Sequence, residues 1–271
     1  MQLARAFNEM ARRTGETVEG LAEAAREKQR FADNLAHELR TPLTAIGGYA
    51  EYIARAELCG EERAQAAQII REETRRLSSM SERLLTMASL REGKLHAESV
   101  DLAQAAHAAL RAVRPQAASR RVQITAERVE PFWIKGDWDR LVSLAVNLMD
   151  NAVKASGEGG QVTLSLMRDG GGALLTVEDR GTGMDSQTLS RLGEPFYRAD
   201  NSRSRAQGGT GLGVAFCFAV TQAHGASLSF DSQPGHGTRA VVRFPACGNG
   251  QTGEGSHAGP RKEKEKTDGG S

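Results

Sequence analysis

One histidine in this sequence stands next to an acid on a stretch with the spacing of an amphipathic helix. His37 is followed directly by Glu38, and Pro42 comes five residues after the histidine. A neutral imidazole is nucleophilic near pH 7, and an adjacent carboxylate can orient it or take its second ring proton. Pro42 lacks a backbone N–H and should bend the helix just after the histidine. These residue types predict a nucleophilic histidine on a helix surface.

A stripe of apolar residues predicts how that helix is oriented. Residues at three-, four- and seven-residue spacing form the stripe: Phe31, Leu35, Leu39, Leu43, Ile46 and Ile53. His37 lies two residues from both Leu35 and Leu39, so it points roughly 200° away from the stripe. We therefore expect the histidine to be held on a rigid element and exposed to solvent.

Two amides and an ammonium share one face of a second predicted helix, which begins near Leu141. Asn147, Asn151 and Lys154 stand at positions i, i+4 and i+7, so they project together. Such a stripe suits Mg²⁺ with attached phosphates, because Mg²⁺ takes oxygen ligands and keeps several waters. A solvent-facing polar stripe would have the same pattern.

Two glycine-containing turns complete the candidate chemistry. Asp179 ends a predicted strand, where its carboxylate can accept a hydrogen bond from the exocyclic amine of adenine. Gly181 and Gly183 allow close approach of the backbone and positive φ, although many strands end in such a turn. The glycine-rich loop 208–213 opens an apolar helix and offers free N–H groups to phosphate. It lacks the Gly-Lys-Ser/Thr of a P-loop and the βαβ context of a Rossmann turn.

Taken in order, the four segments resemble the H-, N-, G1- and G2-boxes of the sensor histidine kinases of two-component systems. The resemblance covers residues 31–246 and implies a Bergerat ATP-binding fold, ATP and Mg²⁺ as cofactors, and His37 as phosphoryl acceptor. It implies that Glu38 acts as general base or orients the imidazole, that Asn151 is a Mg²⁺ ligand, and that Lys154 contacts phosphate. The implied nucleotide-binding residues are Asn147, Asn151, Lys154, Asp179, Gly181, Gly183, Arg198, Arg203, Gly209, Gly211, Gly213 and Thr238.

The same resemblance extends to a lid over the nucleotide. Glu194 to Arg198 resembles the F-box, and residues 185–208 would form a mobile ATP lid. Arg198 and Arg203 match lid positions that reach phosphate in some relatives, although arginines in a loop are commonly only solvated. Thr238, after a glycine turn, would add a hydrogen bond near the adenine.

The expected fold class is α+β with several domains: a helical hairpin that forms a dimeric four-helix bundle, followed by a two-layer α/β sandwich. One helix is expected over residues 1–30, continuous with the helix of His37, and a second over 61–92, with a break at 58–60. In the second helix a seven-residue repeat forms a coiled-coil-like seam at Ile70, Leu77 and Leu84, and at Met80 and Met87. Two such helices cannot bury their stripes alone, so we expect a homodimer.

Domain limits follow from the same pattern. Residues 1–13 resemble the last helix of a HAMP module, although a plain amphipathic helix would have the same pattern, and 14–30 form a connecting helix. The resemblance implies that residues 31–92 form the dimerisation and phosphotransfer domain and 96–246 the catalytic ATP-binding domain, with a hinge near 92–100. Residues 247–271, with Gly, Ser and Lys-Glu repeats, are expected to be a disordered tail.

Composition limits the partners and the compartment. With 35 basic and 34 acidic residues, the net charge of +1 does not indicate nucleic acid or an anionic membrane surface. Cys59, Cys217 and Cys247 fit no metal or disulfide pattern, so a reducing cytosol is expected, with Cys217 in the core. The sequence lacks a run of about 18 apolar residues, so we expect a soluble chain without direct membrane insertion. The HAMP resemblance implies a longer form at the inner face of the plasma membrane.

The expected function is ATP-dependent autophosphorylation of His37, followed by transfer to an aspartate of a separate response regulator. Glu38 and Thr41 also resemble the E-x-x-T arrangement linked to phosphatase activity, in which Thr41 orients a water; alternatively, Thr41 only precedes Pro42 in the kink. The rivals are a gyrase-type ATPase, an ATP-binding scaffold or phosphatase-biased form, and a serine kinase. Against the ATPase, Asn147 stands where such enzymes carry a water-activating glutamate. Asp150 is expected on a different helical face from Asn151.

Overall fold

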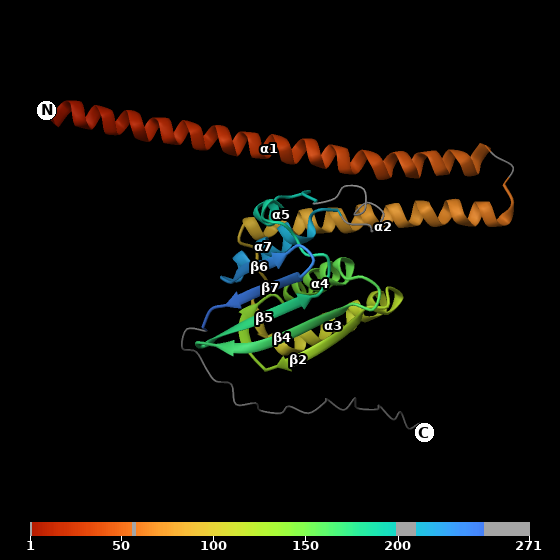
Figure 1. Ribbon diagram of the computed structural model, residues 1–271. Coiled ribbons are helices and arrows are strands. Elements are labelled where there is room, and N and C mark those ends of the chain that lie inside the picture. Colours follow the sequence, from red (N-terminus) through yellow and green to blue (C-terminus); the bar gives the residue numbers. More distant parts are fainter. Residues whose placement is uncertain (1, 56–57, 199–209, 247–271) are drawn as a thin grey trace, which may run out of the picture.

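Two long helices and a helix-covered sheet make up the described chain (Figure 1). The computed structural model of the protein describes residues 2–55, 58–198 and 210–246. Helix α1 (Gln2–Arg55) and helix α2 (Gly60–Arg91) run antiparallel, with α2 beside the C-terminal half of α1. The expected hairpin is therefore confirmed, although Gly60, expected in the break, is the first residue of α2.

Local sequence explains how these helices begin and continue. The backbone N–H of Cys59 donates to Glu62 Oε2 over 3.1 Å, and acids in the first turn favour the positive end of the α2 dipole. Pro42 is buried inside α1, where it leaves the carbonyl of Glu38 without its helical partner. Helix α1 is unbroken across Pro42, and the bend expected there stays a prediction.

A five-stranded sheet organises the second part of the chain in the order β2-β4-β5-β7-β6. Strands β2 and β4 are parallel, and the other neighbours are antiparallel. The bounds of the strands are β2 (Gln123–Val129), β4 (Gln161–Asp169), β5 (Gly172–Asp179), β6 (Ser227–Gln233) and β7 (Gly237–Phe244). A separate antiparallel pair joins β1 (Glu98–Asp101) to β3 (Trp133–Gly136).

Three helices cover one face of the sheet (Figure 1): α3 (Leu102–Ser119), α4 (Trp138–Ala155) and α7 (Gly213–Ala223). Alternate residues of β4 are fully buried, as the period of two in a strand requires. Leu144 and Met149 of α4 and Val220 of α7 also have no exposed surface. The expected two-layer α/β sandwich after the hairpin is confirmed.

Helix α4 has a fixed start, which sets the direction of its polar stripe. The Asp137 side chain caps the helix by accepting from the backbone N–H of Arg140 at 3.1 Å. The N–H of Asp137 in turn donates to His224 Nε2 at 3.0 Å, which ties the start of α4 to the end of α7.

Two elements were missed by the sequence pattern. Strand β1 is only four residues long and pairs with β3 alone, so it shows no alternation, and Asp101 then caps α3. Helix α5 (Ser186–Arg191) lies inside the expected lid and is too short for helical periodicity. The remaining lid residues 199–209 and the tail 247–271, including Cys247, lie outside the described residues. Cys217 is fully buried, as expected.

The apolar seam of α2 is partly buried within the single chain. Met80 and Met87 are 2% and 9% exposed and belong to one apolar cluster with residues of α7 and the sheet. Ile70, Leu77 and Leu84 are half-buried. A heptad pattern identifies an apolar face but not the element that covers it. Two of the five expected seam residues are thus buried within a single chain.

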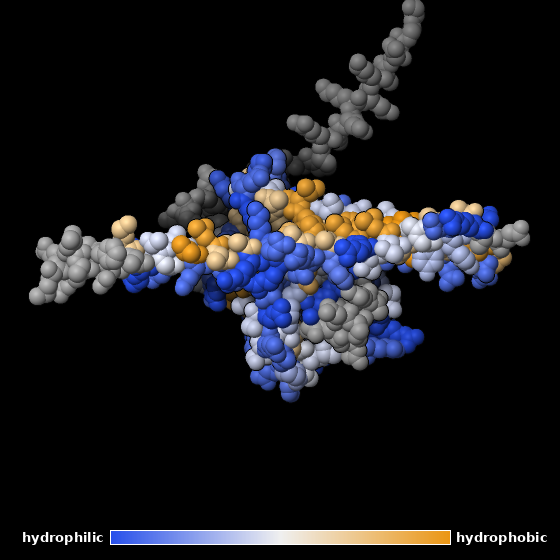
Figure 2. Space-filling model, turned by 90° about the horizontal axis from the view of Figure 1, so that it is seen from above, coloured by the Kyte–Doolittle hydropathy of each residue, from blue (hydrophilic) through white to orange (hydrophobic). Residues whose placement is uncertain are grey.

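Other apolar side chains of the hairpin are uncovered. Figure 2 shows hydrophobic residues gathered along this elongated part of the molecule. On α1, Leu43 is 56% exposed and Tyr52 46% exposed, whereas Leu35 and Leu39 are half-buried. Exposed apolar surface of this extent on a helical hairpin is typical of a face that pairs with another chain.

Candidate active site

A cavity of about 810 Å³ opens where α4, β5 and the N-terminus of α7 meet helix α2. This is the volume range of small-molecule sites in proteins. Expected site residues in its wall are Asn147, Asn151, Lys154, Asp179, Gly183, Arg198, Gly211, Gly213 and Thr238. Arg203 and Gly209 lie outside the described residues.

Asp179 is a buried carboxylate at the end of β5. It is 5% exposed, and its Oδ1 accepts from the backbone N–H of Gly181 at 2.8 Å. Burial raises the pKa of Asp179, while the N–H groups of Gly181 and Thr238 act in the opposite direction. The site therefore holds a buried polar acceptor at the end of β5.

Glycine is required at three turns around this carboxylate. Gly183 has φ +64°, and a Cβ there would lie 1.9 Å from the carbonyl oxygen of Gln233. A Cβ on Gly181 would lie 2.3 Å from the carbonyl oxygen of Ala155. Gly211 has φ +68°, and a Cβ there would lie 2.7 Å from the Phe196 backbone. At each of these positions a side chain would clash with neighbouring backbone, so only glycine fits.

The polar stripe of α4 reaches the same cavity. Asn147 is 8% exposed and donates from Nδ2 to the Ser143 carbonyl at 2.7 Å, which leaves its amide oxygen available. Asn151 is exposed at the wall. Lys154 forms an ion pair with Asp150 at 2.7 Å.

Asp150 also lines this cavity, although we expected it on another face of α4. The cavity spans more than the 100° that separates consecutive helix residues, so both neighbours border it. The Asp150 carboxylate is occupied, because it accepts from Gln116 as well as pairing with Lys154. The described residues contain no group of three His, Cys, Asp or Glu side chains able to hold a metal. A cation here would need oxygen ligands from Asn151 and from the nucleotide itself.

A hydroxyl pair lies at the base of the cavity beside Asp179. Thr238 pairs with Asp179 in the sheet register, and its Oγ1 is 3.0 Å from Ser232 Oγ. Ser232 Oγ also accepts from the N–H of Met184 at 2.9 Å, which fixes the turn after β5. Thr238 is therefore held close to the only buried carboxylate in the described wall.

His37 is exposed on α1, as its spacing predicted, while Glu38 is engaged in a cluster of charges. Glu38 Oε2 is 3.2 Å from Arg76 Nη2 of α2 and 2.9 Å from Arg198 Nη2. The Glu38 and Arg198 side chains are 14% and 5% exposed, so this contact is largely shielded from water. Thr41 is exposed, and its hydroxyl makes only a long 3.5 Å contact to the His37 carbonyl.

The segment before the undescribed part of the lid packs onto the hairpin. The Phe196 ring lies 5.4 Å from the ring of Phe31 on α1, and Phe196 has φ +68°. The Arg191 guanidinium lies 4.2 Å from the ring centroid of Tyr197. Arg198, expected at phosphate, borders the cavity but directs its guanidinium to Glu38.

Sequence reasoning missed three residues of this site. Thr210 is 6% exposed, and its Oγ1 has no hydrogen-bond partner among the described residues. It stands inside the glycine-rich loop, where a hydroxyl between glycines was an available signal. Arg76 and Arg83 come from α2 and also line the cavity. A heptad helix gives no local signal that its polar side will face a nucleotide site.

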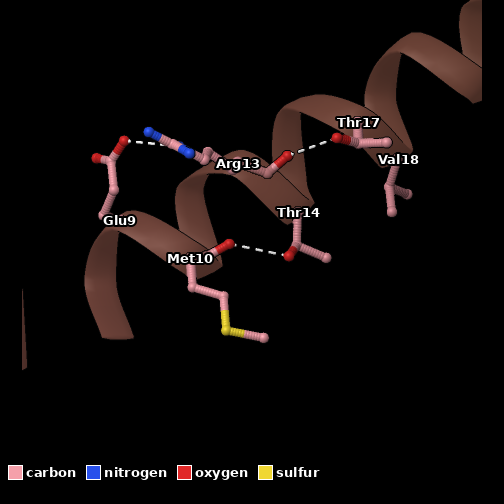
Figure 3. A pocket seen from close by; sticks show the side chains of 6 residues that line it. All are labelled: Glu9, Met10, Arg13, Thr14, Thr17 and Val18. Carbon is pink, nitrogen blue, oxygen red and sulfur yellow. Dashed lines mark hydrogen bonds and ion pairs between the residues drawn. The ribbon is translucent and has the colours of Figure 1, made fainter. Parts of the chain in front are cut away.

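A second depression lies along α1 alone. It is lined by Glu9, Met10, Arg13, Thr14, Thr17 and Val18 (Figure 3). The Thr14 and Thr17 hydroxyls donate to carbonyls four residues back in the same helix, at 2.9 and 2.7 Å. Its polar groups are satisfied within one helix, so this surface offers no convergent site.

Two family models match the chain in the order of these elements. "His Kinase A (phospho-acceptor) domain" matches residues 27–93, and "Histidine kinase-, DNA gyrase B-, and HSP90-like ATPase" matches residues 136–247. No described helix combines the length and the apolar character needed to cross a bilayer.

Individual relatives agree with both models. The chain is 31% identical over 245 residues to "Sensor histidine kinase YkoH" of Bacillus subtilis, covering 90% of this chain and 52% of that one. It is 35% identical over 225 residues to "Histidine protein kinase DivJ" of Caulobacter vibrioides, covering 80% and 37%. The solved structure of full-length ShkA in complex with AMPPNP aligns with a TM-score of 0.59 at 26% identity, over 80% of this chain and 45% of ShkA. The chain thus spans about half, or less, of these relatives.

Proposed function

Because this chain belongs to the sensor histidine kinases, we propose that it binds ATP with Mg²⁺ and phosphorylates itself on His37. The phosphoryl group then passes to an aspartate of a separate response regulator. One observation carries this proposal: the residue next to His37 contacts an arginine of the cavity wall. Glu38 and Arg198 are 2.9 Å apart, although they are 160 positions apart in the sequence. The acceptor helix and the nucleotide cavity are therefore neighbours in one molecule.

The cavity residues have distinct proposed roles in holding ATP. Asp179 accepts a hydrogen bond from the adenine amine, with Thr238 beside it. The turns at Gly211 and Gly213 present backbone N–H groups to phosphate at the start of α7. The unpartnered hydroxyl of Thr210 supports this assignment, because a buried donor gains most from a ligand that accepts from it. Gly181 and Gly183 keep the backbone close to the base.

The phosphate end uses the stripe of α4. Mg²⁺ on Asn151 would neutralise charge on the triphosphate when bound. Lys154 contacts phosphate after leaving Asp150, an exchange of one anion for another of higher charge. Asn147 supplies an amide rather than a carboxylate, and an amide cannot take a proton from water. This favours transfer to histidine over ATP hydrolysis.

Transfer to His37 requires the nucleotide domain to move from its present contact with Glu38. A ring nitrogen of His37 attacks the γ-phosphorus, the bond to the bridging oxygen breaks, and ADP leaves with the electron pair. Glu38 accepts the ring proton, which it can do only after an arginine releases its carboxylate. Arg198 is suited to this exchange, because it can leave Glu38 for a phosphate oxygen.

The partners and the domain limits are also proposals. The uncovered apolar side chains of α1, such as Leu43 and Tyr52, support a homodimer that completes a four-helix bundle. Residues 31–92 and 96–246 are the proposed phosphotransfer and catalytic domains. The HAMP assignment of residues 1–13 and the position at the inner face of the plasma membrane rest on the sequence alone.

Incubation with γ-labelled ATP and Mg²⁺ tests the activity, followed by acid and base treatment of the labelled protein. A phosphohistidine gives label that is labile in acid and stable in base. Release of inorganic phosphate without labelled protein would identify an ATPase instead. Binding of ATP with neither product would identify a scaffold.

A further inference from the structure

Arg83 belongs to the acceptor hairpin, yet its side chain lies in the nucleotide cavity. It projects from α2 into the wall formed by α4 and α7. A Cβ built on Gly213, the first residue of α7, would lie 3.5 Å from Arg83 Nη1. The same point is 3.3 Å from Asn147 Oδ1 and 3.8 Å from Asn151 Nδ2. The guanidinium therefore reaches the helix start and the amide stripe to which the phosphates are assigned.

The surroundings of Arg83 do not satisfy its guanidinium. Within residues 58–198 and 210–246, no hydrogen bond or ion pair engages its five N–H donors. Burial lowers the pKa of Arg83, while the nearby Cys217 and Asp150 act in the opposite direction. Partial desolvation of a cation is costly, so the side chain gains from an anion that accepts hydrogen bonds from it.

The other cations of the described wall are already paired. Lys154 is bound to Asp150 at 2.7 Å. Arg198 and Arg76 share the carboxylate of Glu38, at 2.9 and 3.2 Å. Among the described wall residues, Arg83 is thus the cation that an incoming anion can engage without first breaking an ion pair.

We propose that Arg83 is a phosphate ligand, through which the acceptor hairpin itself binds the nucleotide held by the catalytic domain. The inference rests on the proposed function in one respect, that the cavity takes ATP. Because Arg83 and the α4 stripe come from different parts of the chain, a phosphate bound by both joins α2 to α4 and α7. By linkage, binding of a charged nucleotide then stabilises the arrangement in which α2 lies against α4 and α7. The same arrangement in turn raises the affinity for ATP relative to adenosine.

The test compares the 271-residue chain without substitutions and its Arg83→Gln and Arg83→Lys variants. Calorimetry with ATP and ligand-observed NMR with adenosine give the two dissociation constants. Arg83→Gln should weaken ATP binding about tenfold or more and leave adenosine binding unchanged, as expected for loss of a charge-assisted hydrogen bond. Arg83→Lys should fall between the two. Arg75→Gln is the matched control, because Arg75 is an exposed residue of the same helix.

Each outcome decides the proposal. Retained adenosine binding shows that the variant is folded, so a selective loss of ATP affinity supports a phosphate contact. Equal losses for both ligands would mean that Arg83 only holds the domains together, and no loss would mean that it makes no contact with the nucleotide; either result overturns the inference. In either case the proposed function still stands if the chain without substitutions binds ATP and is labelled on His37. If the chain without substitutions bound no ATP, both the proposed function and the role of Arg83 would be refuted.

Discussion

Replacing Asp179 with asparagine should separate ligand binding from fold stability. The carboxylate is 5% exposed and accepts from the N–H groups of Gly181, at 2.8 Å, and Thr238, and the oxygen of an asparagine can accept from the same groups. The other acceptor capacity is proposed for the adenine amine. Loss of a hydrogen bond to a charged acceptor costs about 1.5–3 kcal/mol, or about 10- to 150-fold in the ATP dissociation constant.

The ligand-free Asp179→Asn variant should not melt below the unchanged protein. Burial raises the pKa of Asp179 in the folded chain. A folded-state pKa above the unfolded value means that the native state binds more protons in that window, so stability is lost as pH rises through it. At neutral pH the ionised, buried carboxylate therefore costs free energy, and asparagine removes this cost. Thermal unfolding without nucleotide should give an equal or higher Tm.

The same carboxylate makes ATP binding depend on pH. Its ionised form is the stronger acceptor for the adenine amine, so affinity should decline on acidification, starting at a higher pH than for an ordinary aspartate. Titration calorimetry across this range measures the effect, with Glu127→Gln as control, because Glu127 is an exposed carboxylate on strand β2. Unchanged ATP affinity in Asp179→Asn, or a markedly lower Tm without ligand, would refute this reasoning.

Three further changes test other parts of the structure. Glu38→Gln removes the proposed base and should slow autophosphorylation about 10²- to 10⁴-fold without weakening ATP binding, because it also frees Arg198. An undiminished rate would exclude that role. Gly183→Ala places a Cβ 1.9 Å from the Gln233 carbonyl oxygen at a residue with φ +64°. It should lower the free energy of unfolding, measured in denaturant, by about 1–3 kcal/mol. Gly157→Ala is the control, because nothing lies within 4 Å of a Cβ there. Leu43→Asp charges a side chain that is 56% exposed on α1 and should convert a dimer to monomers in light scattering; an unchanged mass would place the dimer contact elsewhere.

Local patterns predicted the parts of the site that are set by neighbouring residues. Asp179 and the turn glycines stand at a strand end, and the stripe of α4 follows from helical period alone. The hairpin and the α/β layers were likewise predictable, because their apolar periods extend over many residues. Strand β1 and helix α5 escaped because each is too short to show a period.

Contacts between the two parts of the chain could not be predicted in this way. Glu38 was expected to act on His37 as general base or orienting group, and its pairing with Arg198, 160 positions away, had no signal in the sequence. Met80 belongs to a heptad seam, yet it is 2% exposed within a cluster shared with α7. Arg83 lies on the same helix and faces the cavity. Such pairings depend on how two surfaces dock, which a single sequence period does not specify.

The most direct test of the account locates the phosphoryl group. The unchanged chain and His37→Gln would each be incubated with γ-labelled ATP and Mg²⁺, and ATP binding would be measured in parallel. His37 is exposed on α1 and outside the cavity wall, so its replacement should leave the ATP dissociation constant unchanged. We predict acid-labile, base-stable label in the unchanged chain and none in His37→Gln. Equal label in both chains, with equal ATP binding, would contradict the assignment of His37 as the acceptor.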